Sequence, residues 1–257
     1  MSRIIKPYDY QTGLVKRDDG EKINQGHALG GRLFWVIIPL LLAAAIVAAI
    51  ALRPHTPNSL GDSYLAGSRP PTSINFVFLR DDSGSFAGFE QMRNDAIAQV
   101  LAWAPNNLRN DDTITVISFA SAALVTMPTT LVGDLANNHI SPSRGTAKDG
   151  RYTNLIPALK SAIDTLPSNK TPTSIIAITD TLIADTQSPE IIELLSELNV
   201  TSMSVILPKG MDLNDSWAST FAWEAEFRSD PDDTQAIAIA VGQALAHATG
   251  QRLKANT

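Results

Sequence analysis

A short apolar run that ends in a turn of oxygen-bearing side chains constrains this chain most. Residues 73–79 (SINFVFL) have the composition of a buried β-strand, positions 80–85 read RDDSGS, and a helical pattern begins at Phe86. In an open α/β sheet, ligands bind outside the carboxyl ends of the strands. Asp81, Ser83 and Ser85 alternate along this turn, so one carboxylate and two hydroxyl groups can converge on a hard cation. The alternative is an ordinary loop with a helix cap.

Predicted strands and helices alternate from residue 73 to about residue 250. This pattern is typical of an α/β domain with a doubly wound, mostly parallel sheet covered on both faces. The connection between the strands 113–119 and 123–127 is too short for a crossover helix, so one antiparallel edge strand is expected. The other predicted strands are 174–179 and 201–207, and the predicted helices are 86–104, 155–166, 188–198, 216–226 (with Trp217 and Trp223 inward) and 234–250.

A long segment without strong periodicity, residues 128–152, precedes the helix 155–166. Segments of this length in a compact domain are often functional. It delivers Thr153 to the start of the helix, where this residue is also well placed as an N-cap. Asp180 stands directly after the strand 174–179. Thr153 and Asp180 are therefore further candidate site residues, with capping as the alternative role of Thr153.

Three motifs in this order resemble the metal-ion-dependent adhesion site (MIDAS) of the von Willebrand factor A (VWA) family. They are Asp81-x-Ser83-x-Ser85, Thr153 and Asp180, and the resemblance covers roughly residues 73–250. It implies a VWA, Rossmann-like fold in which these five side chains converge around one divalent ion, Mg²⁺ or Mn²⁺. It further implies that the hydroxyl groups ligate directly, that the carboxylates hold coordinated waters, and that an acidic side chain of a partner protein takes the open position.

Several residues depart from the family pattern. Arg80 replaces an apolar residue and is expected to form a salt link at the rim of the site, and Asp82 adds a charge that either tightens cation binding or faces water. Thr181 stands where a glycine commonly follows the last aspartate, and residues 150–152 (GRY) replace a frequent Gly-Gly pair. None of these changes removes a ligand, but they bear on affinity and on the choice of partner.

Residues 33–52 form a run of 20 residues without a charge, which is long enough to cross a bilayer as a helix. Only Arg53 and Arg69 follow it within about twenty residues, so the positive-inside bias places the N-terminus in the cytoplasm. A cleaved signal peptide with an A-x-A site at residues 49–51 is the alternative, but the long leader favours an uncleaved anchor. The basic residues before the run are Arg3, Lys6, Lys16, Arg17, Lys22 and Arg32.

These features divide the chain into four expected parts. Residues 1–32 are a cytoplasmic tail, 33–52 a transmembrane helix, 53–72 a linker rich in Pro, Gly and Ser, and 73–257 a VWA-like domain outside the cytoplasm. The chain has no cysteine, which excludes a disulfide framework and thiol chemistry. Its net charge of −6 argues against nucleic-acid binding.

An enzymatic function is the less favoured interpretation. The turn faintly resembles the Asp-x-Asp-Gly string of haloacid-dehalogenase phosphatases, with Asp180 and Asp185 as a late acidic pair. Ser83 stands where that family needs its second aspartate, so the general acid is missing. We therefore expect a non-enzymatic, single-pass membrane protein that binds a protein partner through the metal, in adhesion or in a membrane or envelope complex. A metal-independent structural scaffold is the alternative, and a metal-dependent phosphohydrolase is less favoured.

Overall fold

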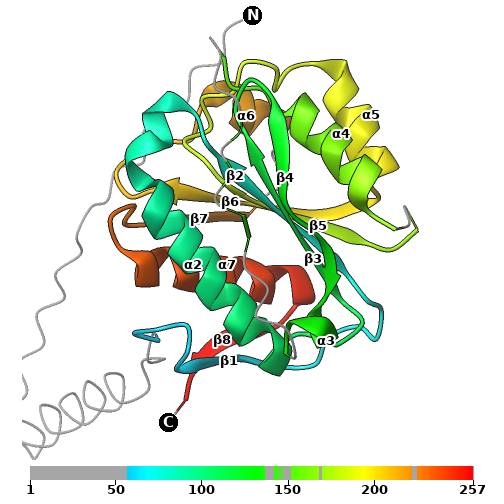
Figure 1. Ribbon diagram of the computed structural model, residues 1–257, viewed down its shortest axis with the longest axis vertical. Helices are drawn as coiled ribbons and strands as arrows, with labels where there is room; N and C mark the ends of the chain where they lie inside the picture. The colour runs from blue at the N-terminus through cyan, green and yellow to red at the C-terminus, as the bar shows by residue number, and fades with distance from the viewer. Residues whose placement is uncertain are drawn as a thin grey trace, which may run out of the picture. The chain divides into compact units, whose positions relative to one another are not determined.

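The structure is a computed structural model that describes residues 57–136, 142, 143, 145, 147, 152–167, 170–221 and 225–256 (Figure 1). These residues belong to one compact unit, Pro54–Thr257. Its elements in chain order are β1 (Ser63–Ala66), β2 (Asn75–Asp81), η1 (Gly84–Phe89), α2 (Glu90–Trp103), η2 (Ala104–Asn106), β3 (Thr113–Phe119), β4 (Ala123–Leu131), α3 (Val132–Leu135), α4 (Ile156–Thr165), β5 (Thr173–Ile178), α5 (Pro189–Glu197), β6 (Val200–Pro208), α6 (Asp215–Thr220), β7 (Ala225–Ser229), α7 (Thr234–Thr249) and β8 (Arg252–Ala255).

A six-stranded sheet forms the centre of this unit, in the order β4-β3-β2-β5-β6-β7. The β3–β4 pair is antiparallel and every other neighbouring pair is parallel. The prediction of an α/β domain with a mostly parallel sheet and one antiparallel edge strand is thus confirmed. Parallel strands buried on both faces contain runs of apolar residues, and residues 76–79 of β2 and 175–178 of β5 are the runs that predict these two strands.

The edge strand β7 corrects the sequence prediction of one helix over residues 216–226. The helix α6 ends at Thr220, and residues 225–229 pair with β6 as a strand. The sequence AEFRS gives little strand signal because alternate residues of this edge strand face solvent. Trp217 is fully buried, as predicted, whereas Trp223 lies outside the described residues.

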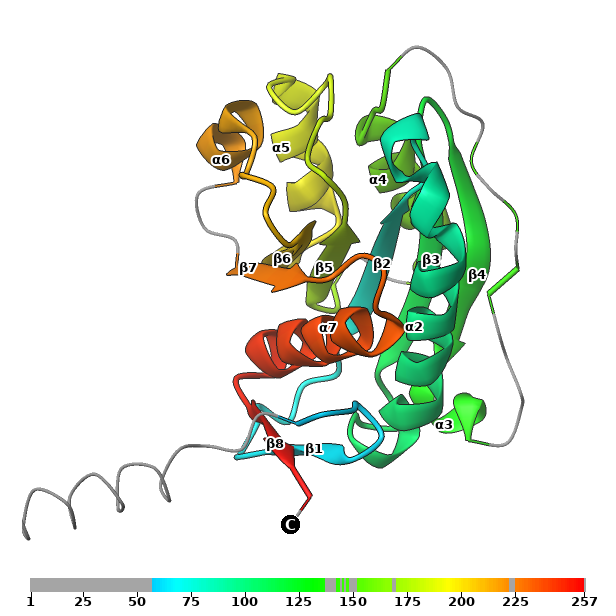
Figure 2. The ribbon, with the colours of Figure 1, turned by 90° about the vertical axis from the view of Figure 1, so that its left-hand side faces the viewer.

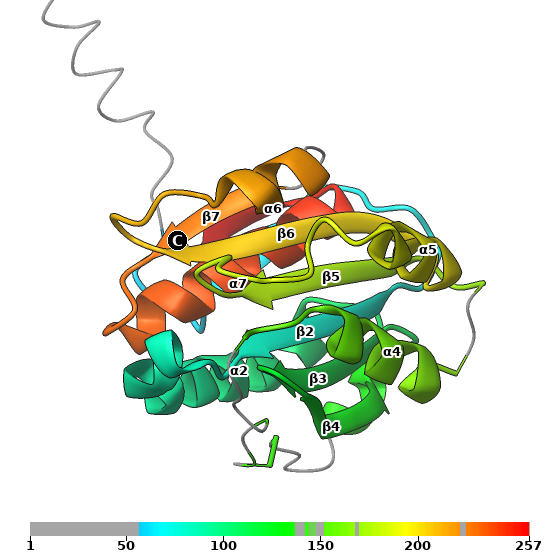
Figure 3. The same ribbon diagram turned by 90° about the horizontal axis from the view of Figure 1, so that it is seen from above.

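Helices cover both faces of the sheet (Figures 1 and 3). Because successive side chains of a strand point to opposite faces, Phe76 and Phe78 of β2 pack with α2 and α7, whereas Val77 and Leu79 pack with α4 and α5. The fold therefore has three layers with two separate apolar cores. In this arrangement the helices cover the faces of the sheet and not the carboxyl ends of its parallel strands, which continue into solvent-facing loops.

A second, two-stranded sheet of β1 and β8 adds structure within the stretch predicted as a linker. Leu60 is fully buried in the α2–α7 core, and the indole Nε1 of Trp103 donates to the carbonyl of Ser63 at 2.8 Å. The two-stranded β1–β8 sheet lies at the C-terminal end of α2 (Figure 2). Its apolar residues are too few to produce a sequence pattern, because their burial depends on helices more than thirty positions away.

The predicted tail 1–32, the predicted membrane helix 33–52 and the start of the predicted linker lie outside the described residues. Among the residues that the structure describes, no helix is both long enough and apolar enough to span a bilayer.

Candidate metal centre

Two neighbouring parallel strands bring the predicted carboxylates to the same edge of the sheet. Asp81 is the last residue of β2, and Asp180 follows the end of β5 by two positions. The register pairs Arg80 with Ile178, so the two chains leave the sheet side by side. The loops that carry the candidate site residues therefore start from a rigid part of the fold.

A chain of hydrogen bonds connects four of the five predicted site residues. The hydroxyl groups of Ser83 and Ser85 lie 3.1 Å apart, and the Ser85 hydroxyl donates to Asp180 Oδ2 at 2.6 Å. Asp81 Oδ1 accepts the backbone N–H of Ser83 at 2.9 Å, and its Oδ2 accepts the hydroxyl of Thr179 at 2.6 Å. No motif in the sequence indicates Thr179, which fixes the orientation of the Asp81 carboxylate.

Thr153 lies at the same edge but is attached through its backbone. Its carbonyl accepts the N–H of Ala184 at 2.8 Å, and the following Asn154 N–H donates to the carbonyl of Ala120 at 2.8 Å. The Thr153 side chain is largely buried, and its hydroxyl makes no hydrogen bond to the other four site residues. The structure thus brings Thr153 to the loops that follow β3 and β5.

Asp185 caps helix α4, which is the alternative role that the sequence left open for Thr153. Asp185 Oδ1 accepts the N–H of Leu155 at 2.7 Å, and Oδ2 accepts the N–H of Ile156 at 3.0 Å. Thr153 therefore does not have the alternative role of a side-chain cap, because a carboxylate from the β5–α5 loop accepts the first free N–H groups of the helix instead. The same contacts engage both oxygens of Asp185, which the phosphatase interpretation needed, with Asp180, as its late acidic pair.

Burial shapes the ionisation of the site. The Asp81 side chain is fully buried and Asp180 is almost so, whereas Ser85 is exposed. Burial raises the pKa of Asp81, the hydrogen bonds from Ser83 and Thr179 oppose this rise, and the nearby charge of Asp180 adds to it. Two carboxylates in a poorly solvated position favour a bound cation, which would offset the cost of keeping both ionised.

A buried ion cluster lies directly beside this site, and it corrects two sequence predictions. Arg80 is fully buried, so it is not at the rim, and it holds Asp82 through Nε–Oδ1 (3.0 Å) and Nη2–Oδ2 (3.2 Å) contacts. The Arg93 Nη2 lies 3.6 Å from Asp82 Oδ1, and Arg93 also donates to the carbonyl of Asp81. Asp82 therefore neither faces water nor is free to bind a cation.

The same cluster holds the segment that precedes Thr153. Arg80 Nη2 donates to the carbonyl of Gly145 at 2.8 Å, and Asp82 Oδ2 accepts the N–H of Ala147 at 3.1 Å. Arg80 Nη1 donates to Asn94 on α2. Burial lowers the pKa of Arg93 to about 10, a value at which this guanidinium group is still charged at neutral pH.

The donor set at the sheet edge fits a small, hard divalent cation. It consists of carboxylate and hydroxyl oxygens, the ligand type that Mg²⁺ and Mn²⁺ prefer. Adjacent ligands of an octahedral Mg²⁺ ion with bonds of about 2.1 Å lie about 3 Å apart. The 3.1 Å separation of the Ser83 and Ser85 hydroxyl oxygens matches this spacing. Within the described residues, no group of three or more His, Cys, Asp or Glu side chains could hold a metal, so a metal site here needs the hydroxyl groups.

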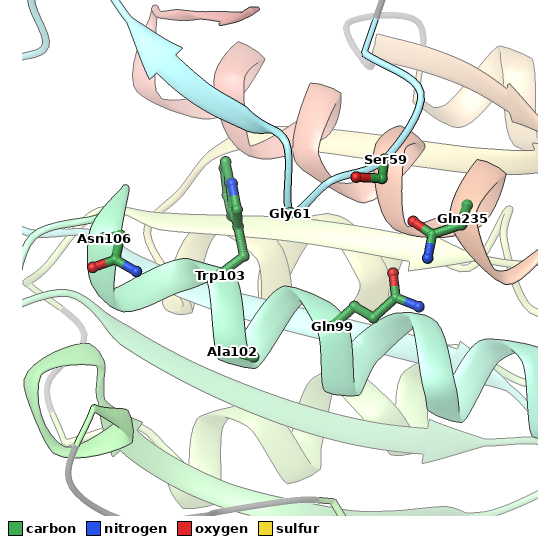
Figure 4. Close-up of a pocket in the computed structure, with 7 residues that line it drawn as sticks. All are labelled: Ser59, Gly61, Gln99, Ala102, Trp103, Asn106 and Gln235. Carbon is green, nitrogen blue, oxygen red and sulfur yellow. The ribbon is translucent and has the colours of Figure 1, made fainter. Parts of the chain in front are cut away.

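A cavity of about 490 Å³ lies elsewhere, between α2, the start of α7 and residues 59–61 (Figure 4). The amides of Gln99 and Gln235 project towards it from the two helices (Figure 4). None of the residues that line the cavity is ionisable at neutral pH. It offers no charge for a metal or an anion, so the candidate chemistry remains with the Asp81 and Asp180 loops.

Comparison with protein families matches residues 76–182 to the model of the von Willebrand factor type A domain. This range contains all five predicted site residues. A search of curated proteins finds no match.

The solved structures that are similar to this chain show low sequence identity. The ArnB paralog VWA2 from Sulfolobus acidocaldarius is 19% identical (TM-score 0.46), with 64% of this chain and 43% of that chain covered. An aerotolerance-related membrane protein from Bacteroides fragilis is 17% identical (TM-score 0.46; 68% and 100% covered). The proximal thread matrix protein 1 of the mussel byssus, with a zinc-occupied MIDAS motif, is 15% identical (TM-score 0.49; 70% and 50% covered). The aligned region thus spans less than half of the first of these proteins.

Proposed function

We propose that this chain is a von Willebrand factor type A domain protein that binds a divalent cation, Mg²⁺ or Mn²⁺, and through it a protein partner. The match to the family model over residues 76–182 supports the domain type. VWA domains generally mediate protein–protein interactions. The proposed ligand set is Asp81, Ser83, Ser85, Thr153 and Asp180.

One observation carries this proposal: the hydrogen-bonded chain from Asp81 through the two serines to Asp180. Two acidic groups that repel each other are held at one edge of the sheet, and the hydroxyl groups between them are spaced like adjacent metal ligands. An ordinary capped loop requires neither the second carboxylate nor the buried Thr179 contact that orients Asp81. A cation-binding role accounts for both.

Each residue has a distinct role in this proposal. The hydroxyl oxygens of Ser83, Ser85 and Thr153 are the neutral metal ligands, and the two carboxylates supply negative charge and orient bound water. When bound, the cation supplies an electrophilic position that accepts a carboxylate from the partner. Thr179 and Asp185 position Asp81 and the Thr153 segment without acting as ligands.

The proposed function is binding and not catalysis. Ser83 stands where the phosphatase interpretation needs a general acid. Both carboxylate oxygens of Asp185 accept N–H groups at the start of α4. We further propose that residues 33–52 anchor the chain in a membrane with the N-terminus in the cytoplasm, on the basis of their uncharged sequence and basic flank. The strand β1 lies at the C-terminal end of α2 (Figure 2), whereas the turn that follows β2 and carries Ser83 and Ser85 precedes the N-terminal end of α2 in the chain.

A thermal-shift titration tests the metal step. Purified full-length protein is titrated with Mg²⁺ and Mn²⁺, with EDTA as reference, and the melting temperature is followed. A ligand that binds only the native state stabilises it by about 2.7 kcal/mol at a hundredfold excess over Kd. We expect a saturable rise that Asp81→Ala abolishes. No shift at millimolar metal, in a protein that is folded by circular dichroism, would favour the metal-independent scaffold.

A further inference from the structure

We propose that Tyr152 and Leu182 form an apolar rim that selects the partner of the metal site. The rim fits a protein segment in which an aspartate or glutamate is flanked by large apolar side chains. This inference rests on the proposed metal-dependent function and specifies which acidic segments the site accepts.

The two rim residues are the most exposed large apolar side chains among the described residues. Tyr152 is 66% exposed and Leu182 is 56% exposed. Tyr152 directly precedes Thr153, and Leu182 follows Asp180 by two positions. Single exposed apolar residues are common on protein surfaces, but each of these two stands within two chain positions of a proposed metal ligand, where its exposed side chain is available to a partner.

The backbone holds Leu182 outward at a conformational cost. Thr181 has a φ of 63°, in the left-handed region that a β-branched residue rarely adopts. Its buried hydroxyl donates to the carbonyl of Asp180 at 2.6 Å and accepts the N–H of Asn214 at 3.0 Å, and these bonds maintain the conformation. The N–H of Leu182 in turn donates to Asp180 Oδ1 at 2.9 Å. Backbone strain of this kind is concentrated at functional sites.

A backbone contact links the two rim segments. The carbonyl of Thr153 accepts the N–H of Ala184, which ties the segment after Tyr152 to the loop that carries Leu182. The segments that carry Tyr152 and Leu182 are therefore joined at this point through the backbone. Segments that are already held in place lose less conformational entropy when a partner binds.

Charge complementarity identifies the centre of the partner segment as acidic. When all are ionised, Asp81, Asp82 and Asp180 carry three negative charges, and the buried Arg80 and Arg93 beside them carry two positive charges. Without metal the cluster has one net negative charge and repels a carboxylate. A divalent ion changes this balance to one net positive charge. The buried arginines thus make the metal-loaded site attractive to an anionic side chain, and the rim supplies apolar contacts around it.

Defined peptides test this inference on the full-length protein. The probes are fluorescein-labelled peptides with the cores Leu-Glu-Phe, Ser-Glu-Ser and Leu-Gln-Phe, and binding is measured by fluorescence anisotropy in Mg²⁺ and in EDTA. We expect the Leu-Glu-Phe peptide to bind about tenfold more tightly than the Ser-Glu-Ser peptide, in Mg²⁺ only. The Leu-Gln-Phe peptide should not bind, because its amide is a poor metal ligand.

Rim variants separate this inference from the metal site itself. Tyr152→Ser and Leu182→Ser should reduce the preference for the apolar flanks to threefold or less while the metal-induced thermal shift remains. Ile192→Ser is the matched control, since Ile192 is 54% exposed on α5, and it should change neither property. An unchanged preference in the rim variants, or equal binding of both glutamate peptides to the wild type, would overturn the rim. Loss of the metal shift in the wild type would instead overturn the proposed function, and the rim with it.

Discussion

The hydroxyl of Ser85 donates a 2.6 Å hydrogen bond to the carboxylate of Asp180, although the two residues are 95 positions apart in the chain. Ser85 belongs to the turn after β2 and Asp180 to the turn after β5, which are neighbouring parallel strands. The contact closes the candidate site into one unit. Any change to it should affect cation binding before it affects folding.

Ser85→Ala should weaken Mg²⁺ binding with little change in stability. Replacement of a residue in the outer shell of a metal site typically costs 10–100-fold in affinity, so the loss of a proposed ligand should cost at least about tenfold. Because Ser85 is exposed, the free energy of unfolding should change by no more than about 0.5 kcal/mol. Isothermal titration calorimetry and urea denaturation measure the two quantities.

Ser219→Ala provides the matched control for this prediction, since Ser219 is also an exposed serine with a single local contact, to the carbonyl of Ser216. It should leave Mg²⁺ affinity unchanged. Equal affinities of Ser85→Ala and the wild type would remove Ser85 from the ligand set.

Asp82→Asn should destabilise the protein by about 3–5 kcal/mol, the usual cost of removing one member of a buried ion pair. The change leaves the buried guanidinium groups of Arg80 and Arg93 without their carboxylate. Urea denaturation of the metal-free protein measures the effect. Asp111→Asn, which removes the partner of the surface residue Arg109, should have a much smaller effect. Similar decreases in the free energy of unfolding in both variants would show that the buried Asp82 ion pairs stabilise the protein no more than the surface pair does.

Asp185→Ala should weaken cation binding although Asp185 is not a proposed ligand. The variant loses both acceptors for the first N–H groups of α4, at a cost of about 1 kcal/mol, and leaves the backbone bond between Ala184 and Thr153 as the remaining contact of this segment with the β5–α5 loop among the hydrogen bonds described above. We expect a lower Mg²⁺ affinity in calorimetry together with a modest fall in melting temperature.

The matched control for Asp185 is Asp233→Ala, which removes the side-chain cap of α7. It should cost similar stability and leave Mg²⁺ affinity intact. If both variants bind Mg²⁺ as the wild type does, the position of Thr153 does not depend on Asp185.

Leu60→Ala should destabilise the domain by about 2–5 kcal/mol, the range for truncation of a buried leucine. Leu60 is fully buried in the α2–α7 core, although it lies in the stretch that the sequence predicts as a linker. Ile192→Ala, at an exposed position, should cost far less in the same urea experiment. A negligible effect of Leu60→Ala would return residues 57–62 to a linker role.

The sequence by itself determined the layered fold and the order of the candidate site motifs. Strands such as β2 and β5 are buried on both faces, so each contains an apolar run, residues 76–79 and 175–178, that can be recognised without knowledge of the neighbouring strands. The short connection between β3 and β4 permitted only a hairpin. These features are local in the chain, and local patterns are readable without coordinates.

Only the tertiary structure decided which polar residues act together. Whether Asp82 faces a cation, water or two buried arginines depends on where α2 places Arg93, and whether Thr153 caps α4 depends on a carboxylate thirty positions away. The strand β7 and the β1–β8 ribbon likewise exist because distant segments supply their hydrogen bonds and their apolar cover. These ion pairs, caps and edge strands are stabilised by partners that are remote in sequence, and the hydrophobic periodicity of a segment does not indicate which remote residues will contact it.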